Sequence, residues 1–527
     1  MKIFYNTRIR TLNPKQPFAS ALAVENDRIV AVGSDEEIKA LTRPGTVIED
    51  LSGYTVWPGL TDAHLHLENY AQSLDFVGCE TPTLAECLRR VAERCQTAPE
   101  GAWVRGHGWN QNLWPEGFGS AADLDAISNG HPIYLTAKSL HASWANSKAM
   151  EMAGITINTK DPEGGTLGRD PHGKPSGILF ENAVALVERI IPSPNLVETK
   201  RLLQAAQQKL LSFGLTGAHD FDGVTCFAAL QELDQEQILK LRMVKSIPRD
   251  LLPHAAALQL HTGFGSDHLR IGSLKLFADG ALGPRTAAML QPYEGETEYR
   301  GMSLMDAEEI FEIGRQAVSS GISIATHAIG DRANHEVINA YEQIMEFERE
   351  KHLAPGRHRI EHVQVIHPED QARLARLGII ASVQPIHATS DMHISDHHWG
   401  ARSANAYAYY SLLKLGSTLA FGSDAPVESP NPFFGLHAAI TRTRPDGTPG
   451  PDGWYPLQKL PLDQAILGYT QDAAFAGRFE DDLGRLSAGF LADFIVLERD
   501  PFDIPPADIF RIQPLAVCIG GDWAWRR

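Results

Sequence analysis

Two histidines separated by one residue are the feature of this sequence with the clearest chemical use. His64 and His66 lie at the end of a short apolar run. Side chains alternate in direction along a strand, so both imidazoles point to the same side and can bind one metal ion. A His-x-His pair alone is a weak signal for a metal site. Three further residues, each at the end of its own strand-like segment, make the signal strong: His327, His362 and Asp424.

The segments that lead to these residues indicate how they are positioned. Residues 321–327 and 417–424 are continuous apolar runs that end in the candidate histidine and aspartate. Such runs are typical of parallel strands covered on both faces. Helical segments are expected at 307–320 and 335–350, and strands that alternate with helices indicate an α/β fold with a parallel sheet. In a (β/α)8 TIM barrel the carboxyl ends of the strands converge on one rim, where the candidate residues would meet.

Eight segments are expected to be strands of this barrel. They are residues 57–66, 214–220, 241–247, 270–279, 321–327, 358–363, 379–384 and 417–424. Eight is the number of strands that closes such a barrel. About 150 residues separate the first segment from the second, so we expect an insertion after the first strand.

The two ends of the chain are expected to form one small β domain. Residues 21–33 are typical of a β-hairpin with its turn at 25–28, and residues 484–497 and 515–521 are strand-like with glycine turns. Neither end is long enough to bury a core alone. We therefore expect a composite β-sandwich of 1–57 with 478–527, a barrel of 58–68 with 191–477, and an insertion of 69–190 that covers the barrel mouth.

Composition restricts the classes of function. The chain has 527 residues, of which 43% are hydrophobic and 21% charged, as in an ordinary globular protein. Its net charge of −18 argues against a nucleic-acid or anionic-membrane partner and leaves a small-molecule substrate and a homo-oligomer open. The sequence lacks an apolar signal core and a run long enough to span a membrane. An odd set of five cysteines indicates reduced thiols, buried as small apolar residues, and a cytoplasmic location.

The candidate ligands also have structural interpretations. A single buried histidine is more often a hydrogen-bonded core residue than a ligand, and we expect that role for His219, His261 and His437. Asp424 lies in a Gly-Ser-Asp-Ala-Pro turn and could be the N-cap of a helix. For the His-x-His pair the ligand interpretation is favoured, because two imidazoles on one face of a buried strand have no obvious structural use.

Several motifs resemble a known family. Residues 58–66, 326–331, 360–363 and 422–427 resemble the metal-site motifs of the amidohydrolase superfamily. Residues 275–283 and 484–493 narrow the resemblance to the amidohydrolase 3 group, which includes N-substituted formamide deformylases. The resemblance extends over nearly the whole chain. It implies a (β/α)8 barrel, a β-sandwich formed by both termini and an insertion after the first barrel strand.

The resemblance implies one more metal ligand, Lys275. In many members the fourth strand ends in a lysine that CO2 has carboxylated, and the carbamate bridges two metal ions. Lys275 occupies the matching place. Burial beside divalent cations disfavours a protonated amine, whose ordinary pKa is about 10.4, and the neutral amine can add CO2. The alternative is an unmodified Lys275 in a salt bridge, with one metal bound.

The implied mechanism is metal-assisted hydrolysis. By resemblance, one metal is held by His64, His66, Lys275 and Asp424, and the other by Lys275, His327 and His362. Zinc suits this set of nitrogen and oxygen ligands, with manganese and iron as alternatives. A water held by the metals loses a proton near neutral pH to give hydroxide. Asp424 would take that proton and return it to the leaving nitrogen.

Substrate contacts are expected in the insertion and after two of the barrel strands. The candidates are Trp109, Asn110, His141, Asp279, Arg285 and Arg332. Arg332 could instead cap its helix or form a salt bridge within it. Residues 391–398 look like another metal-binding cluster, but we expect them to form the loop after the seventh strand without a stable metal.

The sequence thus predicts a metal-dependent amidohydrolase that cleaves a non-peptide C–N bond, in an amide or an N-acyl or N-formyl substrate. One alternative is a deaminase of a heterocyclic amine that uses a single metal in the same barrel. The other is a non-catalytic binding protein, which would have no need for a base beside activated water.

Overall fold

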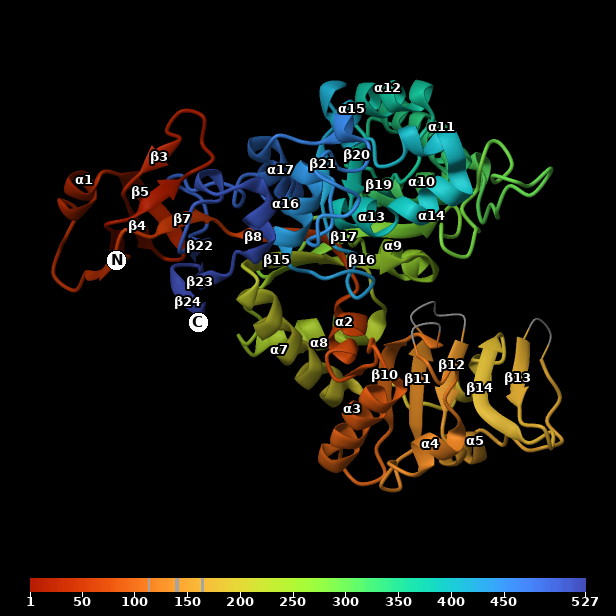
Figure 1. Ribbon diagram of the computed structural model, residues 1–527. Coiled ribbons are helices and arrows are strands. Elements are labelled where there is room, and N and C mark those ends of the chain that lie inside the picture. Colours follow the sequence, from red (N-terminus) through yellow and green to blue (C-terminus); the bar gives the residue numbers. More distant parts are fainter. Residues whose placement is uncertain (112–113, 138–141, 163–164) are drawn as a thin grey trace. The chain divides into compact units, whose positions relative to one another are not determined.

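A computed structural model describes the whole chain except residues 112–113, 138–141 and 163–164. The chain forms two compact units (Figure 1). The larger consists of Met1–Tyr70 with Leu196–Arg527, and the smaller is Ala71–Asn195. The smaller unit is the insertion that follows the first barrel strand.

Within the described part of the larger unit, eight parallel strands form one sheet in chain order (Figure 1). They are β8 (Leu60–Leu65), β15 (Leu215–Asp220), β16 (Arg242–Pro248), β17 (Leu269–Phe277), β18 (Ile324–Ala328), β19 (Arg359–His362), β20 (Ile380–Val383) and β21 (Leu419–Phe421). The chain after β21 returns to β8, where the backbone N–H of Asp424 donates to the carbonyl oxygen of His64 over 2.7 Å. The predicted (β/α)8 barrel is confirmed, and all eight expected strands are present.

Helices between the barrel strands and after the last of them pack on the barrel. The main ones are α7 (Leu196–Ser212), α8 (Val224–Gln235), α10 (Ala307–Ser319), α11 (Asp331–Glu350), α12 (Pro368–Leu377), α13 (Pro385–Ser390), α14 (Met392–Trp399), α15 (Tyr409–Lys414), α16 (Pro432–Thr441), α17 (Leu462–Gly468) and α18 (Gln471–Ala476). On α10 the buried Ile310, Gly314 and Val318 recur every four residues, as on an amphipathic helix. A Cβ at Gly314 would lie 2.3 Å from Ile344 of α11, so these helices pack closely.

Two helical segments differ from expectation. The helix expected from residue 335 begins four residues earlier, at Asp331, with Gly330 as its N-cap. Residues 392–399 form α14 rather than a loop after the seventh strand. Its buried Met392, Ser395 and Trp399 recur at helical spacing, which stabilises a helix there in spite of the polar residues between them.

The first expected strand, 57–66, is two strands separated by one glycine. β7 (Thr55–Pro58) pairs with the terminal strand β22 (Phe494–Leu497), whereas β8 starts the barrel. Gly59 between them donates its N–H to the Asp493 carbonyl oxygen over 2.9 Å. A Cβ at Gly59 would lie 2.2 Å from the Thr216 hydroxyl oxygen, so only glycine fits this close approach.

Strands from both chain ends form two sheets around one core, as expected. One sheet has the order β5 (Arg28–Gly33), β4 (Ala21–Glu25), β1 (Lys2–Tyr5), β6 (Val47–Asp50), and the other the order β24 (Asp522–Arg526), β23 (Pro514–Ile519), β22, β7, β2 (Arg8–Arg10), β3 (Phe18–Ala19). Phe4 packs edge-to-face on Phe494 at 5.1 Å between ring centroids. In the predicted hairpin, Asn26 and Asp27 take positive φ values of 49° and 66°, as a tight turn requires.

The smaller unit has its own sheet and core. Its strands have the order β13 (Gly165–Arg169), β14 (Pro175–Glu181), β12 (Ala142–Ala145), β11 (Ile133–Ala137), β10 (Val104–Trp109) and β9 (Val77–Gly78). The helix α3 (Leu84–Thr97) contributes Cys87, Val91 and Cys95 to this core. The buried indoles of Trp109, Trp114 and Trp144 pack on one another there.

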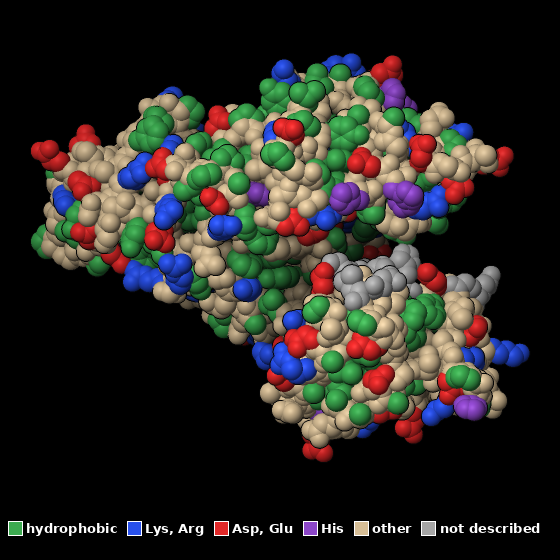
Figure 2. All heavy atoms as spheres, in the orientation of Figure 1, with side chains coloured by type: hydrophobic (Ala, Val, Ile, Leu, Met, Phe, Trp, Pro, Cys, Tyr) green, Lys and Arg blue, Asp and Glu red, His purple; other side chains and the backbone are tan. Residues whose placement is uncertain are grey.

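Cysteines and surface charge agree with a globular protein. All five cysteines are buried with free thiols, as predicted. Figure 2 shows Lys and Arg side chains interspersed with Asp and Glu side chains over the visible face. Across the described residues, every helix is too short or too polar to cross a bilayer.

Candidate active site

Side chains from separate strand ends meet at the carboxyl rim of the barrel. The Nε2 atoms of His64 and His66 each lie 3.5 Å from Oδ1 of Asp424. The ring of His362 is 4.9 Å from that of His64 and 4.6 Å from that of His327, measured between centroids. The structure therefore brings together the five residues that the sequence singled out as metal ligands.

Left-handed backbone shapes this cluster at two strand ends. His362 has a φ of 77° and Asp424 a φ of 60°. Residues other than glycine rarely adopt such values, so the surrounding structure must hold them there. Because the strand pleat is broken at His362, its side chain and that of the preceding Glu361 can both reach the histidine cluster.

A carboxylate sets the tautomer of His64, on β8, and of His66, directly after it. Nδ1 of His64 lies 2.6 Å from Oε2 of Glu361, and Nδ1 of His66 lies 3.0 Å from Oδ1 of Asp222. Since a carboxylate only accepts, the proton is on Nδ1 and the lone pair of Nε2 is free. Nε2 of His64 is buried and lacks a hydrogen-bond partner among the described residues.

The other two histidines also present a free lone pair. Nδ1 of His362 lies 2.8 Å from Oε1 of Gln384, which leaves its Nε2 free. His327 is reversed: its Nε2 donates to the carbonyl oxygen of Gly280 over 2.9 Å and leaves Nδ1 free. Metal-binding histidines almost always donate their second ring N–H in this way. Ligand atoms of His64, His66 and Asp424 lie within 4.8 Å of one another and fit a divalent metal ion.

A buried ion pair holds the carboxylate that contacts His64. Arg359 and Glu361 pair through Nε and Oε1 at 2.5 Å. Arg359 also donates to Nδ1 of His219 and to the Ser382 hydroxyl. Burial raises the pKa of Glu361, but attraction to Arg359 outweighs it and the net shift is downward. Glu361 is therefore an anion that accepts from His64.

We expect Glu361→Gln to weaken metal binding by about 10- to 100-fold. The amide can contact His64 but supplies no negative charge to make the imidazole a stronger ligand. Equilibrium dialysis against metal-buffered solutions measures the affinity. The matched control is Glu348→Gln, because Glu348 also contacts a buried histidine, His358, at 3.2 Å, outside the cluster. Equal affinity in the two variants would contradict this role for Glu361.

Lys275 lies buried at the end of β17. Its Nζ is 4.5 Å from the ring centroid of Phe221 and 4.9 Å from that of Phe277. Burial lowers the pKa of Lys275 to about 8, although Glu361 and Asp424 attract the proton. At this pKa most of the amine is still protonated at pH 7, but its neutral form is far more accessible than that of an exposed lysine.

Asp424 combines burial with proximity to cations. The residue is 9% exposed and its side chain 13%. Burial raises the pKa of Asp424, while His387, His66 and Lys275 act to lower it. The carboxylate is therefore a stronger base than one in water, as the predicted base role requires.

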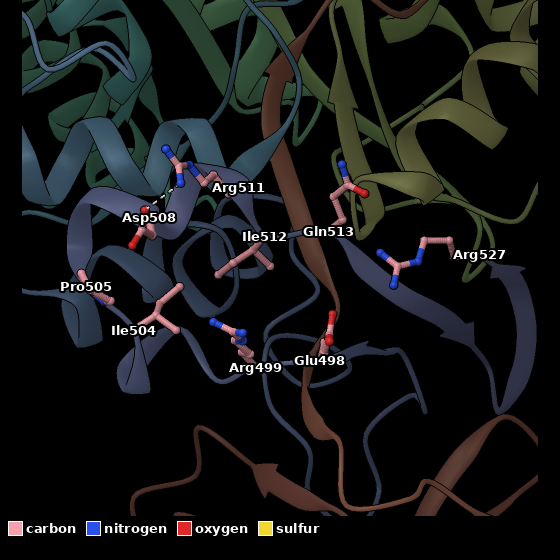
Figure 3. A pocket seen from close by; sticks show the side chains of 9 residues that line it. All are labelled: Glu498, Arg499, Ile504, Pro505, Asp508, Arg511, Ile512, Gln513 and Arg527. Carbon is pink, nitrogen blue, oxygen red and sulfur yellow. Dashed lines mark ion pairs between the residues drawn. The ribbon is translucent and has the colours of Figure 1, made fainter.

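A cavity of about 360 Å³ opens beside Lys275. Phe277 and Leu304 on its wall are 47% and 51% exposed, and Arg249 contributes a guanidinium. Another cavity of about 330 Å³ lies near the C-terminal strands and contains none of the cluster residues (Figure 3). In that second cavity Arg511 pairs with Asp508 at 3.4 Å. Only the first of these two cavities adjoins a residue of the candidate site.

Comparison with known proteins identifies the family. The amidohydrolase family model matches residues 47–523, which is most of the chain. The chain belongs to the amidohydrolase family. This confirms the resemblance seen in the sequence motifs.

Among the relatives of this amidohydrolase, one sequence and one solved structure are named as a deformylase and a hydrolase. The protein LONG AFTER FAR-RED 3 of Arabidopsis thaliana is 32% identical, covering 98% of this chain and 90% of its own. The N-substituted formamide deformylase of Arthrobacter pascens is 28% identical, covering 99% and 98%. The crystal structure of an uncharacterized metal-dependent hydrolase from Pyrococcus horikoshii OT3 is 27% identical, with a TM-score of 0.81 over 96% of this chain and 99% of that one. These findings support a metal-dependent hydrolase.

Of the predicted substrate contacts in the barrel of this amidohydrolase, Asp279 and Arg285 lie in the segment between β17 and α10, and Arg332 lies on α11. Asp279 is 1% exposed and accepts backbone N–H groups of Ile329, Gly330 and Ala288 at 2.8–3.0 Å, so it organises two loops. Arg285 pairs with Glu296 at 2.5 Å. Arg332 is exposed on α11. The carboxylate of Asp279 also lies 3.6 Å from Nε2 of His327.

The insertion residues have different settings. Trp109 is 1% exposed in the core of its own unit, and its indole N–H donates to the Leu135 carbonyl oxygen over 2.9 Å. This packing accounts for Trp109 without a substrate contact. Asn110 is partly exposed at the end of β10. His141 lies outside the described residues.

Of the histidines predicted to be core residues, His219 and His437 are buried and His261 is exposed. His219 is buried and bonded to Arg359, as expected, and His437 is buried against Phe510 with ring centroids 5.2 Å apart. His261 is exposed, so the expectation of a core role is wrong for it. It follows α9 (Leu252–Ala257) in a loop, where its ring contacts the Thr262 carbonyl oxygen.

Sequence reasoning missed the groups that orient the ligands. These are Glu361, Asp222 and Gln384. A further buried histidine beside the cluster, His387, was also missed. Regular alternation along a strand would place Glu361 on the opposite face from its neighbour His362, so the pattern alone does not indicate it. Asp222 follows the end of β15 by two residues, and a search for acidic groups just beyond each strand would have found it.

Proposed function

We propose that this amidohydrolase cleaves a non-peptide C–N bond, in an amide or an N-acyl or N-formyl compound, with Asp424 as general base and then general acid. The observation that carries the proposal is the arrangement of lone pairs around Asp424. Four imidazoles are held in tautomers that leave one nitrogen free, and two of those nitrogens lie 3.5 Å from its carboxylate. A binding protein would not need a buried base at this point.

Two divalent metal ions, zinc by donor type, fit the proposed ligands. His64, His66, Lys275 and Asp424 would hold one, and Lys275, His327 and His362 the other. When bound, the ions supply a water of lowered pKa and polarise the acyl oxygen. The ligand roles are supported by the hydrogen bonds to Glu361, Asp222, Gln384 and Gly280, which orient each imidazole.

The chain's own residues move the protons. Asp424 takes a proton from the attacking water as its oxygen bonds to the acyl carbon. It then returns that proton to the nitrogen as the C–N bond breaks. The products are an amine and a carboxylic acid, which is formic acid for an N-formyl substrate. The raised pKa of Asp424 suits a group that must both accept and release the proton.

Carboxylation of Lys275 belongs to the same proposal. Its amine nitrogen would bond to the carbon of CO2 and lose a proton to give an anionic carbamate. Burial and the lowered pKa of Lys275, about 8, favour the neutral amine that this addition needs. The flanking rings of Phe221 and Phe277 keep the amine away from bulk water.

The cavity beside Lys275 supports a substrate with an apolar group. Phe277 and Leu304 expose apolar surface to it, and apolar walls with few polar groups are usual for small-molecule sites. The relative from Arthrobacter pascens is an N-substituted formamide deformylase, which supports a formyl or other small acyl group.

Metal analysis combined with a substrate panel tests the proposal. We expect about two metal equivalents per chain, release of amine from p-nitroformanilide or from formyl and acetyl N-alkyl amides, and loss of activity on chelation. Adenine and cytosine in the panel report on a deaminase, which would release ammonia and bind one equivalent. Metal-loaded protein that turns over no amide would contradict the proposal.

A further inference from the structure

His387 is a buried histidine beside the cluster that the proposed ligand set does not use. It lies on α13, four residues after the end of β20. Its ring is stacked on that of His362, with centroids 6.3 Å apart and an interplanar angle of 7°. One of its nitrogens, a nitrogen of His362 and a carboxylate oxygen of Asp424 all lie within 4.8 Å of one another. His387 is thus within reach of the reacting groups.

The neighbour of Nδ1 distinguishes His387 from the four proposed ligands. Those imidazoles each contact an acceptor oxygen, whereas Nδ1 of His387 faces the amide nitrogen of Gln364 at 3.4 Å. An amide nitrogen donates, so Nδ1 carries the lone pair and Nε2 carries the proton. His387 therefore presents an N–H where the other histidines present a lone pair.

This N–H lacks a hydrogen-bond partner within the described part of the chain. Nε2 of His387 is buried and makes no hydrogen bond to any described residue, and the whole residue is 5% exposed. A buried donor without a partner is costly in a folded protein, and such groups usually have a function or an absent partner. The nearby Asp424 and His362 place this donor at the proposed site of reaction.

We propose that His387 donates its Nε2–H to the acyl oxygen of the substrate, which becomes negatively charged when water attacks the acyl carbon. This inference rests on the proposed hydrolysis and adds a catalytic residue to it. A fixed donor of this kind stabilises the transition state more than the substrate, because the charge on the oxygen grows during the reaction. Bound metal ions would polarise the same acyl oxygen, and the N–H of His387 would add a hydrogen bond to it.

Replacement of His387 provides the first test. His387→Phe keeps an aromatic ring and removes the donor. We expect kcat for p-nitroformanilide, or the best amide of the panel, to fall about 100-fold with unchanged metal content. His387→Gln carries an amide N–H and should recover about tenfold of that loss. The matched control is His437→Phe, the same change at a buried histidine outside the site, which should retain wild-type kcat.

Gln364→Glu gives opposite results for a donor and for a ligand. A carboxylate at position 364 would accept from Nδ1–H and so move the proton away from Nε2. If His387 is the donor, kcat falls about as far as in His387→Phe while metal affinity stays the same. If His387 is instead a metal ligand, Gln364→Glu strengthens metal binding and His387→Phe removes metal, and the inference is overturned. Gln364→Met, which cannot accept, controls for the change in packing.

The outcomes separate this inference from the proposed function. Wild-type protein that hydrolyses no amide overturns both. Active wild-type protein together with an equally active His387→Phe variant overturns only the role of His387. A lower kcat in His387→Phe with no recovery in His387→Gln would indicate a packing effect and also contradict the donor role.

Discussion

Asp424→Asn protein retains most of its metal and loses about 1,000-fold in kcat; that is the expected result for a residue that acts as both base and acid. The amide keeps the shape of the carboxylate and one oxygen at the position that now lies 3.5 Å from His64 and His66. It cannot take a proton from water. The histidines continue to hold metal, because their orientation depends on Glu361 and Asp222.

Elemental analysis and steady-state kinetics on the same preparation check this expectation. The matched control is Asp472→Asn on α18. Burial raises the pKa of Asp472 to about 6, and its carboxylate accepts from the backbone of Leu419 at the opposite end of β21. That variant should keep wild-type kcat, because Asp472 contacts the first residue of β21 and not the carboxyl end that carries the site. Unchanged turnover in Asp424→Asn would remove Asp424 from the proton-transfer role.

Lys275→Ala is expected to lose at least one metal equivalent and nearly all activity. The change removes the only proposed ligand that is shared by both metal positions. A small carboxylate such as propionate can enter the space left by the side chain and supply the missing oxygens, so partial recovery of metal and activity is expected at millimolar concentrations. Lys275→Met is the matched control, because it fills the space and should show no recovery.

Direct detection of the modification complements this pair of variants. Wild-type protein equilibrated with ¹³C-labelled bicarbonate should show a carbamate signal by NMR, and Lys275→Met should lack it. Full metal content in Lys275→Ala would contradict the bridging role, whatever the activity. Full metal content in the wild type without the carbamate signal would leave an unmodified lysine as the ligand and contradict carboxylation.

Most of the barrel was predictable because its strands are short apolar runs with helices between them. The apolar pattern of residues such as 321–327 indicates a strand without any knowledge of the residues that pack on it. The break between two strands at Gly59 was not predictable, because the apolar run continues through it. The close neighbour that requires a glycine there is Thr216, which is far away in sequence. The segment 392–399 was misjudged because its polar composition hides a buried face of Met392, Ser395 and Trp399.

The candidate site also has a part that could be predicted from the sequence and a part that could not. Residues such as His64 and Asp424 could be predicted because they end strands, and strand ends meet in this fold. The side chains that lie around these ligands could not be predicted. Glu361 reaches the cluster only because His362 adopts a φ of 77°, and His387 reaches it from a helix that no pattern aligned with the rim. Trp109 has the residue type of a substrate contact, yet it serves the core of the insertion.

The single glycine between β7 and β8 has a consequence for how this protein can be engineered. A strand of the terminal sheet passes into the first histidine-bearing strand with no linker, so trimming the chain to its catalytic barrel would cut the support of His64 and His66. Grafting the barrel onto other partners would meet the same obstacle. The terminal β-sandwich thus holds the start of the strand that carries His64, and the barrel cannot be separated from it without loss of that support.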